Sequence, residues 1–471
     1  MQYVSTRGEA PILGFDGVLR AGLASDGGLY VPQAWPQFSA DKIRSLQGLS
    51  YVDLAVEVMM PFIGDAIPRP EFRAMVEQSY RRFSDYPDVT PLERMTDRLS
   101  LLDLTRGPTL AFKDVALQLL GQLFDHSLKQ SGGVMNILGA TSGDTGSAAI
   151  EGCRGRKAVN IFILFPEGRT SEIQRLQMTT VPDANVHALQ VEGTFDDGQT
   201  IVKTLSNDAA FKRELNLTAV NSINWARIMA QVVYYFDAAL KLGAPDKPVS
   251  FVVPSGNFGD AFAGYVAMQM GLPVNKLVLA TNKNDILHRF VQTGTMQRRG
   301  IVPSPSPSMD IDISSNFERI LFDYLDRDSR TVAAHMKSLS EEGQFSVAAD
   351  VMTKMRRHIA SGSATDAETR QAITHAFQNW NRLVDTHTGA GLWTALRLLN
   401  QGGIFGEEQI VCLKTAHPAK FPEDVEISTG KKPPLPEHMK DLYTRPERTL
   451  VLPNDANAVR AYLHKHALRP H

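Results

Sequence analysis

The sequence predicts an α/β protein with doubly wound, mostly parallel sheets in two domains and an additional mixed N-terminal region. The 471 residues are too many for one hydrophobic core. From about residue 134, short apolar runs alternate with helical patterns, and the run VNIFILFP at 159–166 is apolar almost throughout. Such strands are buried on both faces, and the helices between them supply parallel crossover connections.

The elements follow in order along the chain. The N-terminal region, 1–95, contains proline-rich turns, a helix at 51–60, and the turn ASDGGLYVP at 24–32 that leads into a short strand. The alternating part then predicts strands at 134–140, 159–166, 186–191, 217–220, 249–254 and 277–280. Helices are predicted between them at 147–153, 171–178, 199–211, 225–242 and 259–270.

These elements divide into two domains and a tail. We expect a larger domain from 96–130 and 225–429, a smaller α/β domain from 131–224, and a peripheral C-terminal tail from 430–471. The tail is rich in proline and charge and lacks strong periodicity. The proline-rich stretch IVPSPSPSMDID at 301–312 is typical of a flexible linker when taken alone.

Composition excludes several classes of partner. The formal net charge of −2 leaves no basic footprint, so neither nucleic acid nor an anionic membrane is expected. The two cysteines, Cys153 and Cys412, lie in apolar surroundings outside any CxxC pair, which argues against disulfides and a metal site. Neither a secretory signal nor a run of about 18 apolar residues is found. We expect a cytoplasmic protein, as a monomer or a small homo-oligomer.

One lysine stands in an unusual place. In GPTLAFKDVALQLLG, at 107–121, Lys113 comes at the start of a predicted buried helix. A helix N-terminus carries about half a positive charge, so a cation is disfavoured there. Burial and the helix terminus both lower the pKa of an amine, which is what a lysine needs to form a Schiff base. A surface lysine whose stem covers apolar neighbours is the structural alternative.

Three loops that follow apolar strands are candidates for ligand binding. GATSGDTGSAA at 139–149 and VVPSGNFGDAFAG at 252–264 place glycines and hydroxyls before helices, where free N–H groups bind anions. LKTAHPAKF at 413–421 is the third, with Thr415 at the end of its apolar run. Taken alone, the first loop is better explained as a glycine-rich connection between a strand and a helix. Neither a P-loop nor a well-placed GxGxxG is present, which disfavours nucleotides.

Together these motifs resemble threonine synthases of the longer microbial and fungal type, which are pyridoxal-phosphate enzymes of the tryptophan-synthase-β group (fold type II). PTLAFKD resembles the lysine segment of that group. The motifs ASDGGLYVP, GATSGDTGSAAI, PSGNFGD, TNKNDILHRF, SPSMDI, SSNFER and TAHPAKF resemble signatures of the subgroup. The resemblance covers nearly the whole chain. It implies two domains around a cofactor cleft, and it makes the proline-rich stretch an ordered loop.

The resemblance also implies roles for individual residues. Lys113 forms the Schiff base with pyridoxal 5'-phosphate and is the catalytic base, and Thr415 hydrogen-bonds the pyridine nitrogen. The cofactor phosphate is held by Gly256, Asn257, Phe258, Gly259 and Asp260. The substrate-binding residues are Thr141, Ser142, Gly143, Asp144 and Thr145 for the carboxylate, and Asn221, Ser222 and Arg227, from VNSINWAR, for the substrate phosphate.

The implied reaction converts O-phospho-L-homoserine and water to L-threonine and phosphate by γ-elimination and β-addition of water. One position departs from shorter members of the wider group, where an asparagine lies near the 3'-oxygen of the cofactor. Here that position is Asp144. A carboxylate beside a phenolate oxygen is repelled unless one of the two holds a proton, so the asparagine role does not transfer directly.

Two other hypotheses fit the same motifs. One is a different reaction on this scaffold, a serine or threonine dehydratase or a phosphohomoserine lyase that releases 2-oxobutyrate. A dehydratase has no leaving phosphate and gives Arg227 no purpose. The other is a catalytically dead regulator that binds pyridoxal phosphate or phosphate, which needs no amine at position 113.

Overall fold

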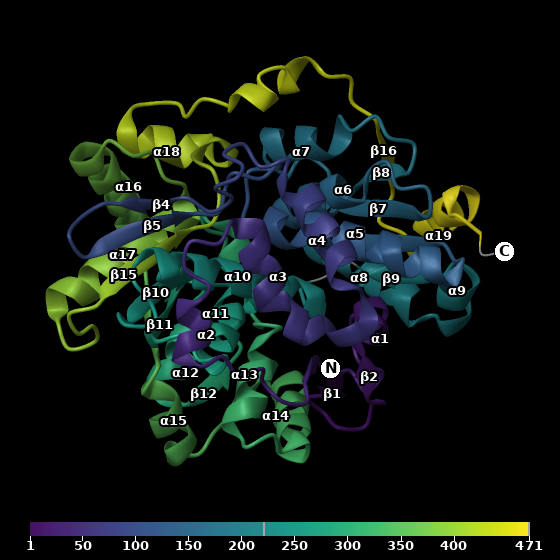
Figure 1. Cartoon of the computed structure of the whole chain (residues 1–471). Coiled ribbons are helices and arrows are strands. Elements are labelled where there is room, and N and C mark those ends of the chain that lie inside the picture. Colours follow the sequence, from purple (N-terminus) through teal and green to yellow (C-terminus); the bar gives the residue numbers. More distant parts are fainter. Residues whose placement is uncertain (220–221, 470–471) are drawn as a thin grey trace.

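The computed structural model describes residues 1–219 and 222–469 and has the predicted α/β architecture (Figure 1). One sheet has six strands in the order β14-β11-β10-β15-β5-β4, and the other has five in the order β16-β8-β7-β6-β9. Among the described residues, neighbours in the five-stranded sheet all pair in parallel, and β4 is the antiparallel member of the larger sheet. The predicted fold class is confirmed.

The N-terminal region forms a small antiparallel sheet, in the order β2-β1-β3, followed by helices. Its elements are β1 (Gln2–Ser5), β2 (Leu13–Gly14), α1 (Phe15–Ala21), β3 (Tyr30–Pro32), α2 (Ala40–Arg44), α3 (Tyr51–Ile63) and α4 (Arg69–Tyr80). The rings of Tyr3 and Phe62 lie 5.7 and 5.5 Å from that of Trp225, the first residue of α10. The N-terminal region therefore packs directly on a helix of the larger domain.

The larger sheet is covered by helices on both faces. Its strands are β4 (Leu92–Arg94), β5 (Leu99–Asp103), β10 (Val249–Pro254), β11 (Val274–Thr281), β14 (Ile359–Ser363) and β15 (Gln409–Lys414). Its helices are α10 (Trp225–Lys241), α11 (Gly259–Gln269), α12 (Ile286–Thr293), α16 (Asp366–Trp380), α17 (Thr386–Gln401) and α18 (Pro422–Thr429). On β10, Phe251 and Val253 join the core that holds α10 and α11, whereas Val252 joins the cluster formed with α16 and α17. This alternation matches the period of a strand.

The smaller sheet is built in the same way. Its strands are β6 (Met135–Ala140), β7 (Val159–Pro166), β8 (Val186–Val191), β9 (Leu217–Ala219) and β16 (Thr449–Leu452). Its helices are α6 (Asp144–Cys153), α7 (Glu172–Thr179), α8 (Phe195–Asn207), α9 (Ala209–Glu214) and α19 (Ala456–His466). Helix α5 (Lys113–Ser131) packs against both α6 and α10. On β7, Phe162 and Leu164 face α8, α9 and α19, whereas Ile161 and Ile163 join the core that also contains α5, α6, α10 and α11. One hydrophobic core thus spans both sheets.

After α12, the chain that leads to β14 forms a separate group of short elements. They are β12 (Thr295–Gln297), α13 (Phe317–Tyr324), α14 (Ser329–Glu341), β13 (Gln344–Ser346) and α15 (Ala349–Arg356). The proline-rich stretch at 301–312 lies here as an ordered loop: Asn282 Nδ2 donates to Ser304 Oγ at 2.7 Å and to Asp310 Oδ1 at 2.8 Å. The composition-based expectation of a flexible linker is wrong, because buried amide and hydroxyl groups hold the loop in place.

In two segments the helices and strands of the structure differ from those predicted from the sequence. The helix predicted at 199–211 is divided into α8 and α9, because Asp208 ends one helix and caps the next by accepting from the N–H groups of Ala210 and Phe211. The 430–471 segment, predicted to be a tail without strong periodicity, contains β16 and α19. β16 pairs in parallel with β8 at the edge of the smaller sheet. The domain boundaries themselves stay predictions.

Helices α5 and α6 approach so closely that their backbones touch. A Cβ atom on Gly121 of α5 would lie 2.0 Å from the carbonyl oxygen of Gly152 on α6, and one on Gly152 would lie 2.3 Å from that of Leu117. Only glycine fits at these two positions. The contact sets how the first residues of the two helices, Lys113 and Asp144, lie relative to one another.

We expect Gly152→Ala to lower the free energy of unfolding by about 1–3 kcal/mol, the usual cost of overpacking, although alanine is the better helix former. Gly133→Ala is the control, because its added Cβ would meet its nearest neighbour at 3.5 Å. Denaturant unfolding monitored by circular dichroism compares the two. A Gly152→Ala protein as stable as the parent would contradict the close-contact interpretation.

Candidate active site

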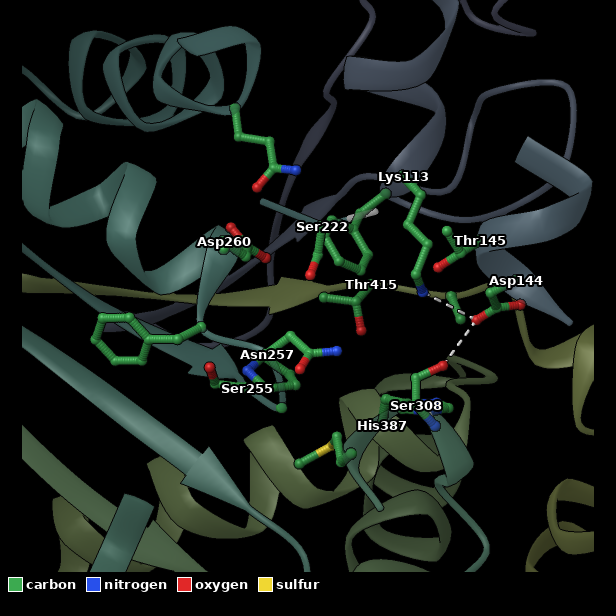
Figure 2. Close-up of a pocket in the computed structure, with 18 of the residues that line it drawn as sticks. Lys113, Asp144, Thr145, Ser222, Ser255, Asn257, Asp260, Ser308, His387 and Thr415 are labelled. Carbon is green, nitrogen blue, oxygen red and sulfur yellow. Dashed lines mark hydrogen bonds and ion pairs between the residues drawn. The ribbon is translucent and has the colours of Figure 1, made fainter. Parts of the chain in front are cut away.

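Four loops at the carboxyl ends of strands meet at one cavity, as parallel sheets require. The loops follow β5, β6, β10 and β15. The described residues of the cavity wall are Phe112, Lys113, Asp144, Thr145, Ser222, Arg227, Gln231, Pro254, Ser255, Gly256, Asn257, Phe258, Gly259, Asp260, Ser308, Met309, His387, Thr415 and Ala416. Figure 2 shows the side chains of Lys113, Asp144 and Thr415 around this cavity.

Lys113 is the first residue of α5, and its side chain is only 10% exposed. Its Nζ lies 3.3 Å from Asp144 Oδ2 and 4.8 Å from the centre of the Phe112 ring. Burial lowers the pKa of Lys113, and the positive charges of Lys420 and Arg227 act in the same direction, opposed by Asp144. The amine is thus held where loss of its proton is favoured, as predicted from its place in the sequence.

Asp144 is the most heavily bonded carboxylate of the site. Lys420 Nζ lies 2.7 Å from its Oδ1, and Gln174 Nε2 donates to the same oxygen at 2.7 Å. Ser308 Oγ donates to Oδ2 at 3.2 Å, beside the Lys113 amine (Figure 2). Burial by itself raises the pKa of Asp144, but Lys420 and Lys113 hold the pKa well below its usual range.

The rest of the first glycine-rich loop is shaped by its own backbone. Thr141 Oγ1 accepts from the N–H groups of Gly143 at 2.9 Å and Gly146 at 3.0 Å, which turns the chain from β6 into α6. The Thr141 side chain is therefore engaged inside the loop. Ser142 is half-buried, and Thr145 faces the cavity. Asp144 and Thr145 are the described residues of this loop that reach the cavity wall.

The second loop forms a glycine-rich cradle between β10 and α11. Gly256 lies so close to the proline-rich loop that a Cβ there would be 2.6 Å from the Ser308 carbonyl oxygen. Phe258 has a left-handed backbone with φ 64°, which turns the loop into the helix. The N-terminus of α11 then faces the cavity with its free N–H groups, an arrangement that favours a phosphate.

Asp260, in the first turn of α11, is buried and receives hydrogen bonds from two tyrosines. Both Tyr234 and Tyr235 donate to its Oδ1. Burial raises the pKa of Asp260 to about 6, against the effect of these hydrogen bonds. Within 1–219 and 222–469, Asp260 Oδ2 and Ser255 Oγ have no hydrogen-bond partner although both are buried. The Ser255 hydroxyl can donate to an anionic ligand such as a phosphate, whereas Asp260 Oδ2 can accept only from a donor.

The remaining predicted residues approach from two further elements. Arg227 lies in α10, is 3% exposed and lines the cavity. Burial lowers the pKa of Arg227 to about 10, so the guanidinium is still a cation at neutral pH. Thr415 follows β15 and is buried in the cavity wall. Ser222 also lines the cavity, with its Oγ 3.3 Å from that of Ser315, while Asn221 lies outside the described residues.

The sequence analysis missed several groups at this site. His387, in the first turn of α17, donates from Nδ1 to Asp385 at 2.7 Å, and its Nε2 accepts the Ser308 N–H at 3.2 Å. Asp385 could have been recognised in the sequence as the cap of α17. The contact between His387 and Ser308 could not, because the two residues are far apart in the sequence. Lys420 stands in the quoted TAHPAKF motif, yet its contact with Asp144 is purely tertiary.

Comparison with known proteins first defines the class. A family model described as "Pyridoxal-phosphate dependent enzyme" matches residues 87–416, the span that contains Lys113, the α11 cradle and Thr415. The parallel sheets and this site define a pyridoxal-phosphate-dependent enzyme of fold type II, and its cofactor is pyridoxal 5'-phosphate.

The same comparisons then give the family. Models described as "Threonine synthase N terminus" and "Threonine synthase, C-terminal" match 2–80 and 388–463. A threonine synthase of Pseudomonas aeruginosa is 49% identical over 100% of this chain and 99% of its own, and one of Schizosaccharomyces pombe is 42% identical over 91% and 89%. The chain belongs to the threonine synthase family and has its activity, that of a pyridoxal-phosphate-dependent lyase.

Solved structures agree with this assignment. The pyridoxal-phosphate-bound threonine synthase of Brucella melitensis superposes with a TM-score of 0.96 at 49% identity over 99% of both chains. The yeast threonine synthase gives a TM-score of 0.93 at 39% identity over 99% of this chain and 98% of the yeast chain. The described part of the chain has no helix long and apolar enough to span a membrane, and no group of three or more potential metal-ligating side chains.

We expect Gly259→Ala to weaken binding of pyridoxal phosphate by tenfold or more. The added methyl group would lie 3.4 Å from Asn316 Nδ2 and 3.7 Å from the Ser222 carbonyl oxygen. A shift of the loop away from these atoms that breaks one charge-assisted hydrogen bond to the phosphate costs about 1.5–3 kcal/mol. Fluorescence titration of the cofactor-free protein measures this affinity. Gly198→Ala in α8 is the matched control, because the added Cβ meets its nearest neighbour at 3.5 Å there and at 3.4 Å at Gly259. Equal affinities in the two variants would count against the cradle.

Proposed function

We propose that this enzyme converts O-phospho-L-homoserine and water to L-threonine and phosphate by γ-elimination and β-addition of water. One observation carries the proposal: the Lys113 amine, the glycine cradle before α11 and the buried Arg227 line the same cavity. A cofactor phosphate and a substrate phosphate need two separate cationic or N–H-rich sites, and the cradle and Arg227 supply one each.

The cofactor-binding residues follow from this arrangement. The backbone N–H groups of residues 256–260 would hold the cofactor phosphate, Lys113 would hold its aldehyde carbon, and Thr415 would hydrogen-bond the ring nitrogen. When bound, pyridoxal phosphate supplies an electron sink for the carbanion formed on the substrate. A neutral hydroxyl such as that of Thr415 does not favour protonation of the ring nitrogen as a carboxylate would. This restrains side reactions and suits elimination and replacement chemistry.

Lys113 moves the protons. With the substrate held at the cofactor, the free Lys113 amine would remove the α-proton and then a β-proton. The phosphate leaves from the γ-carbon, a proton returns to that carbon, and water adds to the β-carbon. The lowered pKa of Lys113 supports this role, because a general base needs a neutral amine near neutral pH.

Two further groups of residues bind the substrate, one its phosphate and the other its carboxylate. Arg227 and Ser222, with Asn221 from the sequence motif, bind the substrate phosphate. The substrate carboxylate is bound by the loop of Thr141, Ser142, Gly143, Asp144 and Thr145. Two features support this assignment: the backbone N–H groups at the start of α6, and the side chain of Thr145 in the cavity wall.

We also propose a cytoplasmic enzyme that acts as a monomer or a small homo-oligomer. Both Cys153 and Cys412 are buried free thiols, which supports a reducing compartment.

A product assay with O-phospho-L-homoserine tests the reaction. We expect threonine and phosphate in equal amounts. A phosphohomoserine lyase on this scaffold would release 2-oxobutyrate instead, and a dehydratase would act on serine or threonine and ignore the phosphorylated substrate. Either result would contradict the proposed reaction.

We expect Arg227→Ala to lower kcat/KM for phosphohomoserine by roughly a hundredfold to a few thousandfold. Two charge-assisted bonds to the phosphate contribute about 3–5 kcal/mol to binding of the transition state. Arg227→Lys should recover only part, because an ammonium lacks the planar fork of a guanidinium. Steady-state kinetics measure both variants.

Slow deamination of serine is the control, because serine carries no phosphate. Arg227→Ala should leave this side reaction and the affinity for pyridoxal phosphate nearly unchanged. Loss of both activities together, or release of the cofactor, would assign Arg227 to the fold or to the cofactor instead.

A further inference from the structure

We propose that Lys420 is the permanent counter-ion of Asp144 and thereby leaves the Lys113 amine free to react with the cofactor aldehyde. Lys420 is a positioning residue: it lies behind Asp144, outside the described cavity wall. The inference rests on the proposed function, because it assumes that Lys113 is the attachment site.

The contacts of Lys420 are fully buried and fixed. Its side chain has no exposed surface, and its Nζ lies 2.7 Å from Asp144 Oδ1 and donates to the Thr109 carbonyl oxygen at 2.9 Å. Its own N–H donates to the His417 carbonyl oxygen at 3.0 Å within a short 3-10 turn (Pro418–Lys420). A buried ammonium needs such partners, and a carboxylate is the strongest of them.

Lys420 and Lys113 contact different oxygens of the Asp144 carboxylate. Lys420 lies at Oδ1 at 2.7 Å, with Gln174 as a second donor, whereas Lys113 lies at Oδ2 at the longer distance of 3.3 Å and shares that oxygen with Ser308. Lys420 therefore makes the closer ion pair. Lys113 can lose its proton and leave a balanced pair of charges behind.

Removing Lys420 would favour the ammonium form of Lys113 over the neutral amine. Asp144 would keep Lys113 as its single lysine partner, and a buried carboxylate without another cation stabilises the ammonium form of its neighbour. The neutral amine of Lys113 has to attack the aldehyde carbon, forming a carbon–nitrogen bond while the carbonyl oxygen leaves as water. An ammonium has no electron pair for this step.

Other charged groups around Lys113 do not replace Lys420. Arg227 lines the cavity from α10 and, like Lys420, lowers the pKa of the Lys113 amine. Asp260, also in the wall, is a carboxyl whose pKa is raised by burial to about 6. His387 reaches Ser308 and Asp385. Of the two described lysines that pair with Asp144, Lys420 has its Nζ within 3 Å of a carboxylate oxygen, whereas Lys113 does not.

The experiment follows attachment of pyridoxal phosphate to the cofactor-free, full-length protein as a function of pH. The rate of the visible absorbance change reports attachment, and borohydride reduction with peptide mapping identifies the lysine. For Lys420→Met we expect the pH midpoint of attachment to move upward by about one to three units, the usual effect of an opposite charge at this range. Attachment at neutral pH should slow by tenfold or more.

Two further variants separate electrostatics from a general loss of packing. Lys420→Met combined with Asp144→Asn removes both charges and should return the midpoint to the parent value or below. Lys420→Arg keeps the charge and should restore most of the attachment rate. Where Lys420→Met does not fold, Lys420→Gln keeps a hydrogen-bond donor for Asp144 and carries the same expectation.

Lys414→Met is the matched control. Lys414 also belongs to a buried pair, with Nζ 2.8 Å from Asp103 Oδ2, but that pair is separate from Asp144. We expect its midpoint to equal that of the parent. An unchanged midpoint in Lys420→Met, or a double variant no better than the single one, would overturn the inference. A label on a lysine other than Lys113 would instead overturn the proposed function.

Discussion

The backbone contact between α5 and α6 decides which charges meet in the cavity. Both helices begin at the cavity, one with Lys113 and the other with Asp144, and they touch through Gly121 and Gly152. A helix N-terminus favours an anion and disfavours a cation. The packing of two helices therefore brings a stabilised carboxylate beside a destabilised amine, and the other polar contacts of the site compensate for this pairing.

Burying these charged groups lowers the stability of the fold, but it also gives the site groups with shifted pKa values. Lys113, Lys420, Arg227 and Asp144 are all buried, and burial disfavours each charge unless it is paired. Lys420 and Asp144 satisfy one another. Burial lowers the pKa values of both Lys113 and Arg227, and at Lys113 it outweighs the opposing effect of Asp144. Shifted groups of this kind are typical of reactive and ligand-binding sites.

The continuous core explains how the site keeps its geometry across two sheets. Ile161 and Ile163 of the smaller sheet and Phe251 and Val253 of the larger one belong to one hydrophobic cluster. Trp225 at the start of α10 extends this cluster to the N-terminal region and precedes Arg227 by less than one helical turn. The position of Arg227 thus depends on packing that involves all three parts of the chain.

The sequence by itself determined the features that depend on local chemistry. Continuous apolar runs between helical patterns predicted the parallel strands, glycine-rich loops predicted the cradle before α11, and a lysine at a helix start indicated an unusual amine. Nothing local distinguished the partners of Asp144: Lys420, Gln174 and Ser308 come from three separate segments, and only the fold brings them within hydrogen-bond distance. The break at Asp208 and the strand β16 were also missed, because a cap and an edge strand depend on their neighbours more than on periodicity. Electrostatic pairing is set by distances across the tertiary structure, and sequence patterns carry no such distances.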